Sequence, residues 1–158
     1  MLTRRERFQT RLAGARREED HGGVGGKRDE PSTRPLLDKL GVKPEHRAAL
    51  LNLDDPDFLF QVMGRVAQVY VNRRRVGLDL IFLGIERRED LRRLRTQRNF
   101  IAPDGAVWVV WPKGSKDVNE NDVRDAALGA GLVDVKVVSF SPSLSALKLV
   151  IRLEDRTR

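Results

Sequence analysis

A strand, a loop, a capped helix and a second strand are predicted in succession between residues 105 and 140. The run Ala106–Trp111 is apolar throughout, which is typical of a buried strand. Asn119 is the expected N-cap of a helix that continues to Ala130 and ends at Gly131. Apolar residues return at 135–140 as another strand. A unit of this kind indicates an α/β architecture.

The rest of the chain continues the alternation. Further strands are predicted at 46–53, 68–71, 78–85 and 145–153, and a helix at 88–99. A short helical turn is expected at 35–41, stopped by its glycine. Alternating strands and helices favour a small, mostly parallel sheet with helices on both faces, a three-layer, Rossmann-like α/β fold. The turn at 141–144 joins two successive strands and predicts a C-terminal antiparallel hairpin.

One more helix is predicted directly after the first strand. Asp55 is its expected N-cap and Pro56 its first residue, because proline is tolerated where the backbone N–H has no helical partner. Four apolar side chains are expected on its inner face: Phe58, Leu59, Val62 and Met63.

The 158 residues fit one domain with an appendage at each end. Residues 1–34 have few large apolar side chains, many charges and a glycine-rich patch at 21–26, so a disordered basic tail is expected there. Residues 35–153 form the predicted α/β domain, and 154–158 a charged C-terminal end. The chain has no cysteine, and its two histidines lie far apart in sequence, so neither a thiol nucleophile nor a metal site is expected.

The formal charge of +7 raises the possibility of an anionic partner. Residues 72–98 hold nine arginines against four acidic residues, and the tail holds most of the remaining excess. Weak, non-specific binding of nucleic acid is therefore one hypothesis, and a solvated charged face is the alternative. The candidate residues for such binding are Arg73, Arg74, Arg75, Arg88, Arg92 and Arg95.

Nothing in the sequence suggests a secreted or membrane protein. The basic N-terminus is not followed by the apolar run of a secretory signal. No apolar stretch approaches the roughly 20 residues needed to cross a bilayer. A cytoplasmic protein with no membrane partner is expected.

Five motifs carry a resemblance to a known family: Leu40–Arg47, Trp111–Lys113, Glu120–Arg124, Gly131–Val137 and Ser145–Val150. With them, residues 35–153 resemble a small bacterial family catalogued as a domain of unknown function. Glu45 departs from that family's pattern, which favours glycine. The order of the elements also resembles the second half of an S-adenosylmethionine-dependent methyltransferase fold. The resemblance implies a degenerate, methyltransferase-like α/β domain.

The same resemblance locates where a methyl-donor cofactor would bind. Methyltransferases of this fold have a glycine-rich turn after the first strand and an acidic residue after the next one. Here the first position reads Asn52–Pro56 without glycine, and the second reads Asn72–Arg75 without a carboxylate. We therefore expect no S-adenosylmethionine, no other cofactor and no catalytic residue.

The loop after Trp111 is the candidate ligand site. Lys113 follows a buried strand where open α/β sheets bind ligands, and the next helix begins nearby with free backbone N–H groups. An anion could be held by Lys113, Ser115, Lys116 and Asn119 beside Trp111. In the alternative interpretation, Trp111 packs in the core, Lys113 is solvated and Asn119 only caps the helix. Arg124 would then pair with Asp117, Glu120 or Asp134.

These observations favour an uncharacterised non-enzymatic binding or interaction module on a degenerate methyltransferase-like scaffold. Its expected partner is an anionic ligand or another protein, neither of which the sequence identifies. An enzyme or small-molecule binder that uses the Lys113 loop is the alternative.

Overall fold

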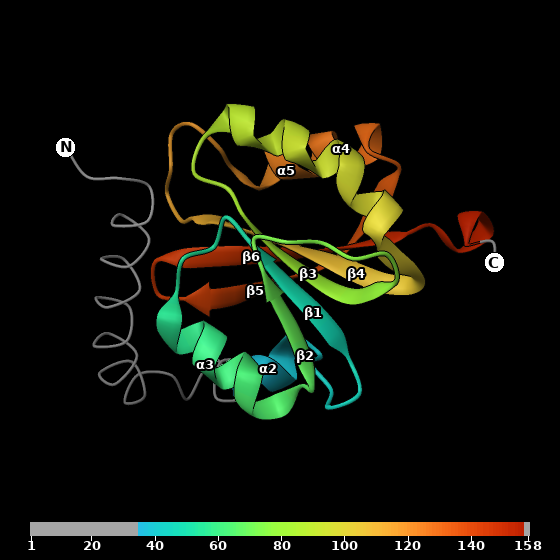
Figure 1. Ribbon diagram of the computed structural model, residues 1–158. Helices are drawn as coiled ribbons and strands as arrows, with labels where there is room; N and C mark the ends of the chain where they lie inside the picture. The colour runs from blue at the N-terminus through green and yellow to red at the C-terminus, as the bar shows by residue number, and fades with distance from the viewer. Residues whose placement is uncertain (1–34, 157–158) are drawn as a thin grey trace.

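A computed structural model describes residues 35–156 (Figure 1). The predicted tail, 1–34, and the last two residues of the predicted charged end lie outside the described residues. The strands are β1 (Arg47–Leu51), β2 (Gln68–Val71), β3 (Leu78–Gly84), β4 (Ile101–Pro112), β5 (Leu132–Ser141) and β6 (Leu144–Ile151). The helices are α2 (Leu36–Lys39), α3 (Pro56–Arg65), α4 (Leu94–Gln97) and α5 (Glu120–Gly129), with 3₁₀ turns η3 (Arg88–Arg93), η4 (Arg98–Phe100) and η5 (Leu153–Asp155).

The six strands form one mixed sheet in the order β2-β1-β3-β4-β6-β5. The first four strands in that order run parallel. β6 is antiparallel to both β4 and β5, so the chain closes with the predicted antiparallel hairpin. Helices cover both faces: α2 and α3 one side, α4 and α5 the other (Figure 1). The predicted Rossmann-like α/β fold is confirmed.

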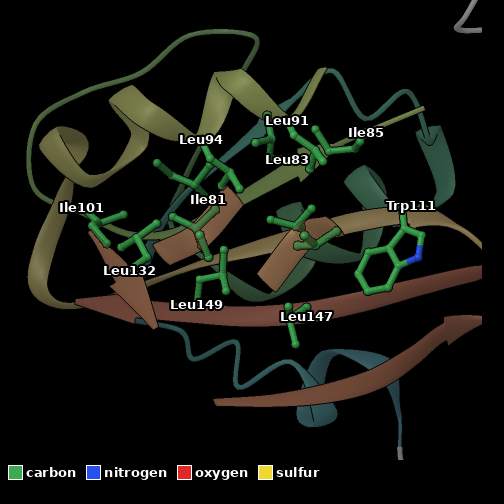
Figure 2. Packing of buried hydrophobic residues seen from close by; sticks show 14 of the residues in the cluster. Ile81, Leu83, Ile85, Leu91, Leu94, Ile101, Trp111, Leu132, Leu147 and Leu149 are labelled. Carbon is green, nitrogen blue, oxygen red and sulfur yellow. The ribbon is translucent and has the colours of Figure 1, made fainter. Parts of the chain in front are cut away.

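Each face of the sheet has its own apolar core. Trp108 is fully buried among the residues on the α3 side, and its indole N–H donates to the Leu40 carbonyl at 3.1 Å. Trp111, three residues later, lies in the opposite core with Ile81, Leu83 and Leu94 (Figure 2). Residues three apart on a strand point to opposite faces, so this division follows from the strand's period of two.

Several predictions about individual helices and strands need correction. Met63 does not lie on the inner face of α3, because it is 56% exposed, whereas Phe58 and Val62 are buried. The predicted helix at 88–99 is divided into η3, α4 and η4. β5 begins at Leu132, three residues earlier than predicted, because the strand starts as soon as Gly131 (φ +80°) has ended the helix. The N-cap of α3 is confirmed: the Asp55 side chain accepts from the Phe58 N–H at 3.2 Å.

Gly84 brings the ends of β1 and β3 into close contact. A Cβ atom at this position would lie 2.2 Å from the carbonyl oxygen of Asn52. Only glycine therefore lets the two strand ends approach in this way. Within residues 35–156, no helix is long and apolar enough to cross a membrane.

Candidate functional site

Two asparagines join the carboxyl ends of the first three parallel strands. Asn52 follows β1 and Asn72 follows β2, with φ of 56° and 55°, a left-handed conformation that asparagine tolerates better than most residues. The Asn52 N–H donates to Asn72 Oδ1 at 2.9 Å, and Asn52 Nδ2 donates to the Gly84 carbonyl at 2.8 Å. The Asn72 N–H donates a hydrogen bond to the Leu50 carbonyl at 2.7 Å. These bonds fix the edge of the sheet where open α/β folds bind ligands.

A cleft of about 340 Å³ opens at this edge, between the strand ends and the helical segment 93–97. Its walls combine apolar, amide, hydroxyl and guanidinium groups, from Leu51, Asn52, Asn72, Arg74, Leu83, Arg93, Thr96 and Gln97. Two of these eight residues are cationic, and no carboxylate of the described chain lines the cleft. The cleft therefore favours a ligand with negative charge.

The Arg74 side chain is held in place at the cleft wall. Its guanidinium carbon lies 4.2 Å from the centre of the Phe100 ring, and NH1 donates to Thr96 Oγ1 at 3.0 Å. Thr96 itself donates to the Arg93 carbonyl at 3.5 Å. Stacking on the ring and the bond to Thr96 restrict the rotamers of Arg74 before any ligand arrives.

Gln97 contributes a buried acceptor to the same wall. Its side chain is 3% exposed, and Nε2 donates to the Arg93 carbonyl at 2.8 Å. Its Oε1 atom is buried and has no hydrogen-bond partner within residues 35–156. Buried polar atoms are almost always hydrogen-bonded, so this unpaired oxygen is an exception.

The other predicted arginines have different surroundings. Arg73 and Arg75 lie near the Tyr70 ring, with guanidinium carbons 6.0 and 5.4 Å from its centre. Arg88 faces acidic groups: its N–H donates to Asp117 at 3.0 Å and its NH1 lies 3.4 Å from Asp122. The exposed residues Arg92 and Arg95 have no ion pair in the described part of the chain. The hydrogen bond between Arg74 and Thr96 brings the segment 73–75 close to the helical segment 94–97.

The Lys113 loop differs from the prediction in one respect. We expected Lys113 to point toward the start of α5, but its ammonium group donates to Ser139 Oγ on β5 at 2.7 Å. Its N–H also donates to the Ser143 carbonyl, because β4 ends beside the β5–β6 turn. Trp111 is buried in the core, and Lys116 is exposed.

Backbone N–H groups at the start of α5 already donate hydrogen bonds to nearby side chains. Asn119 Oδ1 accepts from the Asp122 N–H at 2.9 Å, and Asp122 Oδ2 accepts from the Asn119 N–H at 3.0 Å, a capping box. Ser115 Oγ accepts from the N–H groups of Asp117 and Val118. With Asp117, Glu120 and Asp122 close to this terminus, the local field is less favourable for an anion than the sequence suggests.

Arg124 takes the structural role that one interpretation gave it. It forms ion pairs with Glu120, one helical turn earlier, and with Asp134 on β5, the latter at 3.1 Å. The pair with Asp134 joins α5 to the edge strand β5, while the pair with Glu120 lies within the helix.

Of the residues that line the cleft, only Arg74 was a candidate from the sequence, which missed five polar residues: Asn52, Asn72, Arg93, Thr96 and Gln97. The asparagines did carry a signal, because each directly follows a short apolar strand, where a residue that tolerates positive φ is needed. Arg93 was counted only as part of a charged helix. Neither Thr96 nor Gln97 belongs to a recognisable pattern, since their roles depend on how η3 and α4 pack.

Comparison with solved structures confirms the fold class. The chain is similar to a SAM-dependent methyltransferase from Aquifex aeolicus, with 12% identity, a TM-score of 0.52, and coverage of 77% of this chain and 89% of that one. It is also similar to the pyocyanin biosynthetic protein PhzM, with 13% identity, a TM-score of 0.51, and coverage of 74% and 53%. No family model and no curated protein sequence matches the chain. The fold is thus a methyltransferase-like scaffold.

Proposed function

We propose that the protein is a non-enzymatic binding module that holds a small anionic ligand in the cleft at the carboxyl ends of β1, β2 and β3. The observation that carries this proposal is the lining of the cleft: two arginines, two asparagines, a threonine and a glutamine. These groups bind and orient a ligand. None of them is a carboxylate, histidine, lysine or cysteine, the usual sources of a general base or a nucleophile.

The residues that line the cleft also argue against binding of S-adenosylmethionine. The position after β1 has Asn52, whose N–H is already donated to Asn72. The position after β2 has Asn72 where the resemblance implies a carboxylate for the ribose. Arg74 and Arg93 add positive charge that opposes a sulfonium cation.

Calorimetric titration of the full-length protein with S-adenosylmethionine tests this proposal. We expect no saturable heat at ligand concentrations up to the millimolar range, and no methyl transfer to added acceptors. A dissociation constant near one micromolar, or methyl transfer to an added acceptor, would contradict the proposal.

A second candidate function is weak association with nucleic acid. It is supported by the exposed Arg73, Arg92 and Arg95, which make no ion pair within residues 35–156, and by the hydrogen bond that brings their two segments together at Arg74 and Thr96. Such binding would be insensitive to sequence and would weaken steeply between about 50 and 200 mM salt. Fluorescence anisotropy with two unrelated oligonucleotides at both salt concentrations distinguishes it from specific recognition, which would separate the two sequences.

A further inference from the structure

We infer that the ligand of the cleft is a phosphorylated small molecule, and that its phosphate binds between Arg74 and Arg93. This inference rests on the proposed function and adds the chemical class of the ligand. It starts from the charges of the cleft wall. Arg74 and Arg93 line the same cleft, and neither has an ion-pair partner within the described chain. The cleft therefore holds two cations without a matching anion.

The anchoring of Arg74 supports a bound oxyanion. Of its five N–H donors, only one is given to Thr96, and stacking on Phe100 fixes the plane of the guanidinium group. A cation that is already oriented loses little conformational freedom on binding, so its hydrogen bonds contribute more to affinity. Thr96 and Gln97 both bond the Arg93 carbonyl, so the backbone that carries the second arginine is tied to the same wall.

A phosphate fits two arginines better than a carboxylate does. A carboxylate has two oxygens and a single negative charge, so it can bond to both guanidinium groups but balances only one of their two positive charges. A phosphate monoester has three terminal oxygens and a charge near −2 at neutral pH, so both guanidinium groups can bond to it.

The other residues of the cleft indicate the chemistry of the remaining part of the ligand. Leu51 and Leu83 provide apolar contact, and Asn52 and Asn72 add amide groups. A cleft of about 340 Å³ is near the lower end of small-molecule pockets, which span roughly 300–1,000 Å³. The expected ligand is thus a compact phosphate monoester whose body has an apolar surface and polar groups that the amides of Asn52 and Asn72 can bond.

Matched pairs of compounds test the inference on the full-length protein. Adenosine monophosphate, uridine monophosphate and glucose 6-phosphate are each compared with their unphosphorylated partners by thermal shift, and hits are titrated by calorimetry. At least one phosphorylated member should raise the melting temperature, while its partner should not. Affinity should rise as pH increases through about 6, where the second phosphate proton is lost and arginine stays charged.

Substitutions then locate the phosphate. Arg74→Gln and Arg93→Gln should each weaken binding about tenfold or more, as expected for a lost charge-assisted hydrogen bond. Arg92→Gln is the matched control, because Arg92 is exposed on the same helical segment and does not line the cleft. Its variant should bind like the parent.

Several outcomes would overturn the inference. They are a response to neither member of any pair, equal affinity for both members, or equal losses in the Arg92 and Arg93 variants. Binding of carboxylates with no change between pH 5 and 8 would also overturn it, while leaving the proposed function intact. The proposed function itself would fail separately, through binding of S-adenosylmethionine.

Discussion

Asn72 accepts a hydrogen bond on its side-chain oxygen from the backbone N–H of Asn52, at 2.9 Å. The two residues stand at the positions where the resemblance to methyltransferases implies a glycine turn and an acidic ribose contact. Here they bond each other and close the ends of β1 and β2. This edge of the scaffold is thus built from groups that bond to one another, and Arg74 and Arg93 line the cleft beside them.

The left-handed conformation of Asn52 leads to the first prediction. Asn52→Ala should destabilise the protein by about 1–2 kcal/mol, because alanine disfavours a φ of 56° and loses the bond to the Gly84 carbonyl. Asn52→Gly should cost less, since it loses the bond but relieves the backbone. Urea unfolding measures both. Equal losses in the two variants would mean that the backbone conformation contributes nothing.

The close approach at Gly84 leads to the second prediction. Gly84→Ala should destabilise the protein by about 2 kcal/mol or more, because its Cβ would meet the Asn52 carbonyl and force the strand ends apart. Gly64→Ala is the control: Gly64 lies within α3 with open space around it, and alanine there should stabilise by about 0.5–1 kcal/mol. Thermal unfolding that gives both variants the same shift would contradict the packing at Gly84.

Lys148 on β6 leads to a prediction about pH. Burial, and then the charges of Lys136, Arg156 and Lys43, lower the pKa of Lys148 below its usual value of 10.5. Lys136 lies directly opposite it on β5. Since the folded-state pKa is the lower one, unfolding takes up a proton between the two pKa values. The contribution of Lys148 to the free energy of unfolding therefore rises with pH between the two pKa values and is lowest below the folded-state pKa.

Lys148→Gln should accordingly stabilise the protein at neutral pH, by no more than about 0.5 kcal/mol because the site is partly solvated. The advantage should shrink as pH rises toward 10.5 and as salt is added. Lys116→Gln, at an exposed position, is the control and should be neutral. A variant that is less stable than the parent at pH 7 would show that Lys148 makes a favourable contact.

Gln97 leads to a prediction that separates binding from stability. Gln97→Leu removes the acceptor that has no partner as well as the bond to the Arg93 carbonyl. The Arg93 carbonyl keeps its bond from Thr96, and removal of the unpaired oxygen offsets the lost bond, so stability should change by less than about 1 kcal/mol. Affinity for the ligand should nevertheless fall. A loss of several kcal/mol in urea unfolding with unchanged affinity would make Gln97 purely structural.

The sheet was predictable from sequence, but the cleft was not. Continuous apolar runs such as 80–85 and 106–111 are typical of strands buried on both faces. Asp55 and Asn119 identify helix starts through side-chain bonds that lie within three residues. The cleft depends on contacts between distant residues: Arg74 meets Thr96 and Phe100, and Asn52 meets Asn72 and Gly84. Such pairings have no signature in a single sequence.

The contacts of the Lys113 loop were only partly predictable from the sequence. A lysine beside a helix start predicted an anion site, yet the loop's own side chains form the cap and the turn, and three carboxylates gather there. Sequence distance alone did not indicate that Lys113 would meet Ser139 across the β5–β6 hairpin.

The most direct test of the account is an NMR titration of backbone amides in the full-length protein. A phosphate monoester that binds should shift the amides of Asn52, Asn72 and residues 93–97, which surround the cleft. The amides of residues 113–121 should remain unchanged, and S-adenosylmethionine should shift neither group. Shifts concentrated at 113–121, or shifts of Asn52 and Asn72 caused by S-adenosylmethionine, would contradict the claim that this edge of the scaffold is an anion-binding cleft.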